Sequence, residues 1–540
     1  MNPRFDNKQI VDFFPFPNYR TFQRETIEEV QGHLLNNVKD IILEMPTGSG
    51  KSPVAISTGI WSENAYCLTS QKILQDQYIR DFEENMQVSV LKGRGNYECT
   101  FLGSPTMCNE CYEPARKECY RNGTCLYQNA KRRTASATIA LMNYCYFLNV
   151  IDCDPSQVFK PRKLLICDEA HCLESELMSQ IEFVLSEFVF KRMNYPVTVP
   201  TYETLQEYAA WIQENIDAIG KILNNKSGQL KSMNQYRVNL SKDSAEFLRL
   251  AGESAELASE VEDIDRLFRR MKTFLETLSH VEWIFTVEKT EKLKFKRVVF
   301  RPLTVDQFAN AALLCYGTQR LYMSATILDK KSFCKSLGLN FEEAVFIRVS
   351  STFPPENRKI YFTKTGYMNM ANIDETLPKI VTDVNKALDY HKAEKGLIHC
   401  HSYKIANFIE QNCYNPRLIF HDSTNREVML SKFMTSKEPM VIVSPSMTEG
   451  LDLKDDLARW EIIVKIPYLY IGDKQTARRM KVDPDWYNWQ TCLTLVQCYG
   501  RIFRSETDWG TAYIFDSGAR SFIQKNKAIL PEWFLEACQF

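Results

Sequence analysis

Short apolar runs rich in β-favouring residues alternate with helical patterns in two separate parts of the chain. The first part contains the apolar runs 41–43 and 65–68, with a helical pattern at residues 72–82. A second set of buried strands comes late in the chain, at residues 396–399, 440–443, 461–464 and 512–515. Alternation of this kind is typical of parallel sheets covered by helices. The sequence therefore predicts two α/β units.

The middle of the chain, about residues 183 to 300, has a helical pattern instead. Its apolar positions repeat at spacings of four and three, as on one face of a helix. The two stripes are Leu205, Ala209, Ile212, Ile216, Ile219 and Leu223, and then Leu257, Val261, Ile264, Phe268, Met271, Leu275 and Leu278. Residues 224–228 (Asn-Asn-Lys-Ser-Gly) are a turn signal between them. We expect two long antiparallel helices. A free coiled coil is the alternative, but each stripe covers about three heptads.

The composition fits an intracellular protein of several packed domains. At about 150 residues per domain, 540 residues correspond to about three or four domains, and 44% hydrophobic residues exclude a disordered chain. The N-terminus lacks the apolar stretch of a secretory signal. The longest uncharged stretch, residues 134–151, predicts a buried strand and helix rather than a membrane span. Because the net charge is −1, contact with a polyanion would need a local basic patch.

A glycine-containing loop follows the first buried strand. Residues 43–52 read Leu-Glu-Met-Pro-Thr-Gly-Ser-Gly-Lys-Ser, a relaxed P-loop with Met45 where the strict pattern has glycine. Backbone N–H groups of such a loop surround phosphate oxygens, and the next helix adds its positive end. The residues expected to bind phosphate are Thr47, Gly48, Ser49, Gly50, Lys51 and Ser52. Among them, Lys51 is expected to reach the β- and γ-phosphates and Ser52 to bind Mg²⁺. A chance loop of this composition is the alternative.

A later buried strand ends in carboxylates. Residues 163–167 (Lys-Leu-Leu-Ile-Cys) precede Asp168, Glu169 and, after Ala170, His171. A carboxylate at the carboxyl end of a strand lies where a Walker B aspartate holds the metal. Asp168 is therefore predicted to hold Mg²⁺ and Glu169 to orient or deprotonate the attacking water. His171 is expected to couple the nucleotide to other motifs.

Two later elements fit the same phosphoryl-transfer site. Residues 324–326 (Ser-Ala-Thr) follow an apolar run, and residues 497–504 (Gln-Cys-Tyr-Gly-Arg-Ile-Phe-Arg) place Arg501 and Arg504 three positions apart. That spacing predicts that both arginines lie on one helix face. A guanidinium at the γ-phosphate accelerates phosphoryl transfer by roughly 10³–10⁵. We predict both as arginine fingers, although such pairs are also common on solvated helices.

Five of the 17 cysteines fall between residues 99 and 125, far more than an even distribution would place there. They are Cys99, Cys108, Cys111, Cys119 and Cys125. Thiolates that converge from a short loop-rich stretch need a metal around which to fold. Cys108 and Cys111 form a CxxC pair, which is also a zinc spacing, so a zinc site is the alternative. Disulfides are disfavoured in a reducing cytosol.

The same stretch is basic and rich in tyrosine. Residues 92–133 contain eight basic and four acidic side chains, a local excess of four positive charges, with Tyr97, Tyr112, Tyr120 and Tyr127 among them. Basic groups neutralise phosphates, and aromatic rings stack on unpaired bases. The segment therefore predicts a nucleic-acid contact. The alternative for the tyrosines is that they cover the metal site.

Together these residues resemble superfamily 2 helicases and, more narrowly, the iron–sulfur XPD/DinG family. The order of the motifs carries the resemblance: residues 20–23 (Q motif), 43–52 (I), 69–72 (Ia), 168–171 (II), 324–326 (III), 446–452 (V) and 497–504 (VI). The resemblance implies nucleotide-binding roles for Arg20, Gln23, Glu449, Gly450 and Asp452, and a catalytic role for Gln497.

The resemblance also implies the architecture. It is an α/β fold with two RecA-like motor domains, of which the first carries an iron–sulfur cluster insertion and a helical arch insertion. The expected boundaries are 1–97, 134–182 and 301–345 for the first motor domain, 98–133 for the cluster domain, 183–300 for the arch and 346–540 for the second motor domain. In the family four cysteines hold a [4Fe–4S] cluster. Here the implied ligands are Cys99, Cys111, Cys119 and Cys125, with Cys108 as the rival of Cys111.

The implied activity is ATP-dependent 5′→3′ translocation on single-stranded DNA with unwinding of forked DNA. The implied cofactors are ATP, Mg²⁺ and the [4Fe–4S] cluster, and a monomer is compatible with this activity. One alternative is an RNA-directed DEAH-type remodelling ATPase with a zinc module. Another is a binding or redox-sensing scaffold with an inactive motor, which the intact Lys51, Asp168, Glu169, Arg501 and Arg504 argue against.

Overall fold

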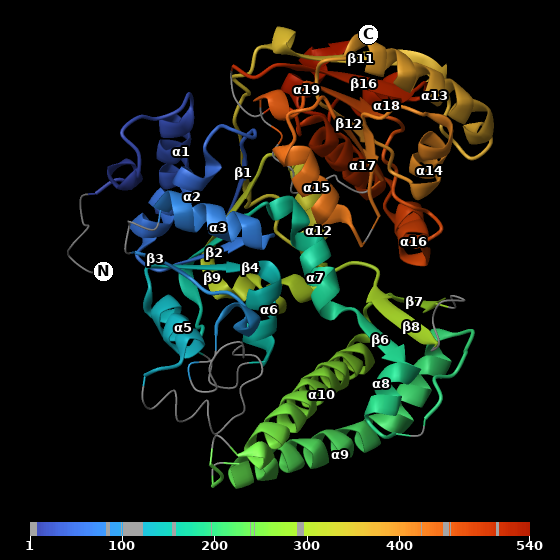
Figure 1. Cartoon of the computed structure of the whole chain (residues 1–540). Helices are drawn as coiled ribbons and strands as arrows, with labels where there is room; N and C mark the ends of the chain where they lie inside the picture. The colour runs from blue at the N-terminus through green and yellow to red at the C-terminus, as the bar shows by residue number, and fades with distance from the viewer. Residues whose placement is uncertain are drawn as a thin grey trace.

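The computed structural model describes residues 8–82, 87–98, 100, 123–153, 158–195, 197–237, 239–241, 244–288, 296–422, 424–445, 453, 455–503 and 507–540. In this part of the chain lie two parallel sheets of seven strands each and an antiparallel sheet of three strands. Figure 1 shows the first large sheet at the left, the second at the upper right, and a helical arm below both.

The first large sheet has the spatial order β10-β1-β9-β5-β2-β4-β3, and all of its neighbouring strands are parallel. Its strands are β1 (Asp40–Glu44), β2 (Ala65–Thr69), β3 (Val88–Val90), β4 (Ile139–Asn143), β5 (Arg162–Asp168), β9 (Gly317–Ser324) and β10 (Val345–Arg348). Strands β1 and β2 are buried along their whole length, as expected where helices cover both faces of a parallel sheet.

One helix of this first unit precedes its first strand, and the others lie between strands. They are α1 (Gln23–Leu35), α2 (Lys51–Ser62), α3 (Lys72–Phe82), α5 (Leu126–Ser136), α6 (Tyr144–Cys153), α7 (Leu173–Ile181), α11 (Asp306–Ala312) and α12 (Lys330–Leu337). The uncharged stretch 134–151 forms β4 and α6, so the prediction of a buried strand and helix is confirmed. Among the described residues, no helix is long and apolar enough to cross a membrane.

The second large sheet has the order β13-β14-β12-β15-β16-β11-β17 and is also parallel throughout. Its strands are β11 (Arg358–Gly366), β12 (Gly396–His399), β13 (Leu418–Phe420), β14 (Val441–Ser444), β15 (Trp460–Ile463), β16 (Gly510–Asp516) and β17 (Cys538–Gln539). Numbered within its own sheet, each set of strands has the same arrangement, 7-1-6-5-2-4-3. The prediction of two α/β units is confirmed, and both follow one topology.

The helices of the second unit are α13 (Ile373–Tyr390), α14 (Tyr403–Asn412), α15 (Arg426–Thr435), α16 (Lys474–Val482), α17 (Pro484–Tyr499), α18 (Ala519–Lys525) and α19 (Glu532–Ala537). Helix α16 extends from the second sheet towards the base of the arm (Figure 1). Helix α17 follows α16 after one residue and begins with Pro484, whose fixed φ suits the first helical position.

The helical arm, residues 183–302, is inserted between β5 and β9 of the first unit. It consists of β6 (Phe183–Ser186), α8 (Glu187–Arg192), α9 (Leu205–Arg237), α10 (Ala245–Thr277), β7 (Trp283–Glu288) and β8 (Arg297–Pro302). The long helices α9 and α10 pack on each other, as the two apolar stripes predict. The turn expected at residues 224–228 is wrong, because α9 continues through it. Within that run Lys226 pairs with Glu260 of α10 at 2.8 Å, so the partner helix stabilises the helical conformation.

Candidate active site

The P-loop connects β1 to α2, as the sequence predicts. Gly48 (φ 79°) and Gly50 (φ 92°) adopt left-handed conformations that favour glycine. The side chain of Lys51, the first residue of α2, crosses back over the loop and donates to the carbonyl of Met45 at 3.2 Å. The ammonium group and the N-terminus of α2 therefore point to the same place, which suits the phosphates of a nucleotide.

Arg20 and Gln23 contact this loop. The Gln23 amide donates to the carbonyl of Gly50 at 2.9 Å and accepts from the Arg20 backbone N–H at 3.0 Å. The Arg20 guanidinium donates to the carbonyl of Gly48. The residues that resemble the Q motif thus hold the backbone of the phosphate loop. Ser49, in contrast, donates its hydroxyl to Pro46 within the loop, which is a supporting contact.

Asp168 is the last residue of β5 and is buried. Its Oδ2 accepts a hydrogen bond from the Tyr78 hydroxyl at 3.0 Å. Burial, and then the neighbouring charge of Glu169, raise the pKa of Asp168 to about 6, although Lys51 opposes this rise. A divalent cation would offset the crowding of negative charge and keep Asp168 ionised. No sequence pattern identifies Tyr78 as a site residue, because a tyrosine within a helical pattern is usually a core residue.

Glu169 lies at the turn after β5 in a left-handed conformation, with φ 52°. For a residue with a side chain this is strained backbone, of the kind found at functional sites. Its Oε2 lies 3.3 Å from Nδ1 of His171. Burial opposes ionisation, but the hydrogen bond and charge of His171 lower the pKa of Glu169 to about 2. A carboxylate with so low a pKa is better suited to orienting a water molecule than to removing its proton.

A chain of polar contacts leads from His171 to the second unit. Nδ1 of His171 lies 2.8 Å from Oγ of Ser324, at the end of β9. The same Oγ accepts the backbone N–H of Thr326 at 3.1 Å. The side-chain hydroxyl of Thr326 then accepts from the amide of Gln497 in α17 at 3.2 Å. The residues that resemble motifs II, III and VI are thus joined by a continuous series of polar contacts, one of which passes through the backbone N–H of Thr326.

Arg501 also reaches the carboxylates from the second unit. Its positive charge contributes to the low pKa of Glu169. The expectation that Arg501 and Arg504 share a helix face is wrong, because α17 ends at Tyr499 with Gly500 as its C-cap. Arg501 follows in a turn. Arg504 lies outside the described residues, as do Glu449, Gly450 and Asp452.

A cavity of about 580 Å³ lies between the two units. Residues of both units line it, among them Arg20, Gln23, Thr47, Gly48, Gly50, Lys51, Ser52, Asp168, Glu169, His171, Thr326, Gln497 and Arg501. The volume is within the range of small-molecule sites. Phe16, Ile73 and Phe82 also line it; the sequence motifs did not identify these apolar side chains, which suit an aromatic base beside the phosphates.

Comparisons with known proteins agree with this geometry. The family model "Helicase C-terminal domain" matches residues 387–537, and "Type III restriction enzyme, res subunit" matches residues 17–194. A probable ATP-dependent helicase of Methanocaldococcus jannaschii is 22% identical, over 94% of this chain and 93% of its own length. The ATP-dependent DNA helicase YoaA of Haemophilus influenzae is 21% identical, over 90% of this chain and 89% of its own length.

A solved XPD helicase structure superimposes over 95% of this chain and 98% of its own, with a TM-score of 0.63 at 17% identity. The chain thus has the fold of this XPD helicase structure and is similar over most of its length to known ATP-dependent helicases. These similarities agree with the resemblance stated from the motifs, and the two parallel sheets are consistent with two RecA-like domains.

Of the five clustered cysteines, Cys125 lies within the described residues, and Cys99, Cys108, Cys111 and Cys119 lie outside them. Cys125 is the N-cap of α5, is 6% exposed, and its Sγ accepts the backbone N–H of Gln128 at 3.5 Å. A buried thiol at a helix N-terminus suits a metal-bound thiolate. Within the described ranges no group of three or more metal-ligating side chains occurs, so the cluster remains a prediction.

The described part of the basic segment is partly engaged inside the protein. Lys92 pairs with Asp76. Arg94 pairs with Glu262 of α10 at 3.5 Å and lies over the ring of Tyr127. Tyr127 itself is 3% exposed. For this tyrosine the structure therefore favours a packing role over base stacking, and two of the counted positive charges are matched by carboxylates.

Proposed function

We propose that this chain is an ATP-dependent DNA helicase that moves 5′→3′ along single-stranded DNA and separates the strands of forked DNA. The observation that carries the proposal is the cavity between the two units. One unit supplies the phosphate loop and both carboxylates, and the other supplies Gln497 and Arg501. Hydrolysis then depends on how the two units lie relative to each other, which is what a translocating motor requires. DNA as substrate is supported by the name of the Haemophilus relative.

In this mechanism Lys51 binds the β- and γ-phosphates, while Ser52 and Asp168 hold Mg²⁺. When bound, the ion neutralises charge on the phosphate oxygens. Glu169 orients the water that attacks the γ-phosphorus, and Arg501 stabilises the charge that develops on the departing phosphoryl group. Release of phosphate changes the environment of Glu169. The contacts through His171, Ser324 and Thr326 carry that change to Gln497 and the second unit.

We also propose that Cys99, Cys111, Cys119 and Cys125, with Cys108 as the alternative to Cys111, hold a [4Fe–4S] cluster. Cys125 supports this assignment through its burial and its place at the N-terminus of α5. When bound, the cluster supplies a cross-link that folds a cysteine-rich segment. Anaerobically purified protein should contain iron and acid-labile sulfide, and Cys125→Ser should lose both. Zinc without iron would contradict the assignment.

The activity is tested with purified full-length protein, ATP, and DNA duplexes that carry either a 5′ or a 3′ single-stranded tail. We expect DNA-stimulated hydrolysis and separation of the duplex with the 5′ tail. Lys51→Ala should abolish both. Lys386→Ala is the matched control, since Lys386 is exposed on α13 and pairs with Asp383 of the same helix. Stimulation by RNA but not DNA would overturn the substrate, and unwinding from the 3′ tail would overturn the polarity.

A further inference from the structure

A buried carboxylate outside the nucleotide cavity joins the two motor units. Glu174 lies at the start of α7, three residues after His171, and its side chain is 10% exposed. It forms an ion pair with Arg479 of α16. It also accepts hydrogen bonds from the indole N–H of Trp486 at 3.0 Å and from the amide of Gln490 at 3.4 Å, both in α17.

The environment of this ion pair makes it costly to open. The Arg479 side chain is 4% exposed, and its guanidinium lies over the Trp486 ring, 3.9 Å from the ring centre. Removing one partner of a buried pair leaves an uncompensated charge. The adjacent Arg478 pairs with Glu282 of the arm at 2.6 Å, but there both side chains are nearly half exposed. Two neighbouring arginines of α16 thus make one buried and one solvent-screened contact.

The contacts of α17 continue along the first unit. At its N-terminus, the capping residue Asp483 pairs with Lys335 of α12 at 2.7 Å. In its middle, Trp489 donates its indole N–H to the carbonyl of Ile327 at 2.7 Å. Near its C-terminus, Gln497 donates to Thr326. A helix of the second unit therefore lies along the first unit, and only its C-cap, Gly500, separates its last residue from Arg501.

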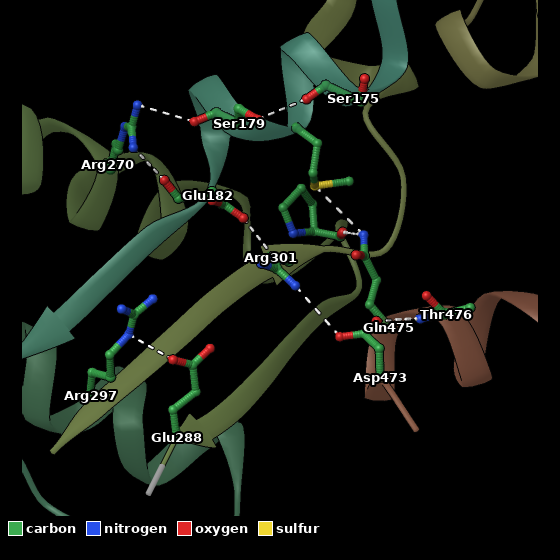
Figure 2. Close-up of polar contacts among 12 residues, drawn as sticks. Ser175, Ser179, Glu182, Arg270, Glu288, Arg297, Arg301, Asp473, Gln475 and Thr476 are labelled. Carbon is green, nitrogen blue, oxygen red and sulfur yellow. Dashed lines mark hydrogen bonds and ion pairs between the residues drawn. The ribbon is translucent and has the colours of Figure 1, made fainter. Parts of the chain in front are cut away.

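The base of the arm holds the other end of α16 (Figure 2). The Gln475 amide donates to the carbonyl of Pro302 at 2.7 Å. Asp473, the N-cap of α16, pairs with Arg301 of β8 at 3.5 Å, and Arg301 pairs with Glu182 at 2.6 Å. Because α16 is held at both ends, the α16–α17 segment has little freedom to shift along the first unit. Glu174 contacts both helices of this segment, through Arg479 of α16 and through Trp486 and Gln490 of α17.

We propose that Glu174 is a positioning residue for ATP hydrolysis. By holding the first turns of α17, it sets where Arg501 lies relative to Glu169 and the γ-phosphate. An α-helix rises about 1.5 Å per residue, so Trp486 and Gln497 are about 16 Å apart along a stiff rod, and a shift at one end moves the other. Glu174 follows Asp168 and Glu169 on the same short segment. The contacts of Glu174 therefore set the position of α17, and with it Arg501, relative to both carboxylates. This inference rests on the proposed function.

The first experiment measures steady-state ATP hydrolysis by full-length protein with saturating single-stranded DNA. Glu174→Gln should lower kcat about tenfold, because small displacements of a catalytic group have effects of this size or larger. The KM for ATP should stay within about twofold, since the phosphate loop is not touched. Trp486→Phe removes one N–H donor to Glu174 and should lower kcat less, in the same sense. Arg478→Ala is the control on α16 and should leave kcat unchanged.

The second experiment separates positioning from a general structural role. Glu174→Gln is combined with Arg501→Ala, and the effects on kcat are compared. If Glu174 acts through Arg501, Glu174→Gln should lower kcat little further in a protein that already carries Arg501→Ala. The inference is overturned if the factors by which the two substitutions lower kcat multiply in the double variant. It is also overturned if Glu174→Gln leaves kcat unchanged. Thermal unfolding is followed for every variant, and if Glu174→Gln is unfolded, the same cycle with Trp486→Phe decides. Absence of DNA-stimulated hydrolysis in the wild-type protein would instead overturn the proposed function.

Discussion

The two large sheets share one strand arrangement but differ at the carboxyl ends of equivalent strands. After its first strand, the first sheet has the P-loop and Lys51, while the first strand of the second sheet ends at Gly366 and a loop, residues 367–372, leads to α13. The fifth strand of the first sheet ends in Asp168. The fifth strand of the second, β15, is followed by Val464 and Lys465. The topology alone therefore does not make a nucleotide site. The loops after the strands determine which of the two units binds the nucleotide and which supplies additional side chains to it.

The interiors of the two sheets differ as well. In the first sheet, Asp40 of β1 forms a buried ion pair with Arg320 of β9 at 2.6 Å. In the second, His399 of β12 lies 3.4 Å from Glu461 of β15, and both side chains are buried. The first sheet thus contains a buried pair of opposite charges. The second contains a buried histidine beside a carboxylate, and burial lowers the pKa of that histidine, His399.

The largest effect should come from removing Arg501, a side chain that the second unit supplies to the nucleotide cavity. Arg501→Ala should lower kcat for ATP hydrolysis by about 10³, because a guanidinium at the γ-phosphate has at least this effect. The KM for ATP should change much less. Arg520→Ala is the control in the same unit, since Arg520 lies over Phe362 and does not line the cavity. A kcat within twofold of wild type would show that the first unit hydrolyses ATP without the second.

The second prediction concerns the stability of the first sheet. Asp40→Ala leaves Arg320 buried without its carboxylate and should cost about 3–5 kcal/mol of the free energy of unfolding. The Tyr322 hydroxyl, which donates to Asp40 at 3.0 Å, loses its acceptor as well. Urea unfolding monitored by circular dichroism measures the loss. Asp374→Ala is the control, because Asp374 forms an exposed pair with Lys404 and should cost less than about 1 kcal/mol.

The third prediction concerns acid sensitivity of the second unit. Burial, together with the charge of Lys465, lowers the pKa of His401 to about 4, against an ordinary value of about 6.5. Between these values the unfolded chain binds a proton that the folded chain does not, so stability falls as pH falls. At about 1.4 kcal/mol per unit, His401 should account for about 2 kcal/mol between pH 7 and pH 5. Below about pH 4 its contribution no longer changes.

The measurement compares urea unfolding of the wild-type protein and His401→Gln at pH 7, 6 and 5. The difference in the free energy of unfolding between the two proteins should become smaller towards acid pH, because the variant lacks the titrating ring. Parallel pH profiles for both proteins would contradict the prediction. Burial also lowers the pKa of His399 in the same unit, so some acid sensitivity should remain in His401→Gln.

Much of this architecture could be predicted from the sequence, because the decisive signals are local. The glycines of the P-loop and the carboxylates after β5 occupy positions that strand-then-loop patterns define. Residues defined by contacts across the chain could not be found in this way. Tyr78 and Glu174 look like an ordinary helical core residue and an ordinary charged residue until folding places Asp168 and Arg479 beside them. The error at residues 224–228 has the same origin, since Glu260 of the partner helix stabilises that stretch.

The smallest effect is expected for the hydrogen bond between Gln497 and Thr326, which joins the two units. Gln497→Ala removes the amide that donates to Thr326, which is one neutral hydrogen bond, worth about 0.5–1.5 kcal/mol. We expect kcat to fall roughly three- to tenfold, far less than for Arg501→Ala. If the polar chain from His171 carries information between the units, the loss should be larger for DNA-stimulated hydrolysis than for hydrolysis without DNA. Thr326→Val, which removes the acceptor, should give the same ratio between the loss of kcat with DNA and the loss without DNA. Equal losses with and without DNA would mean that Gln497 contributes to hydrolysis alone, and that the polar contacts from His171 do not carry the effect of DNA between the units.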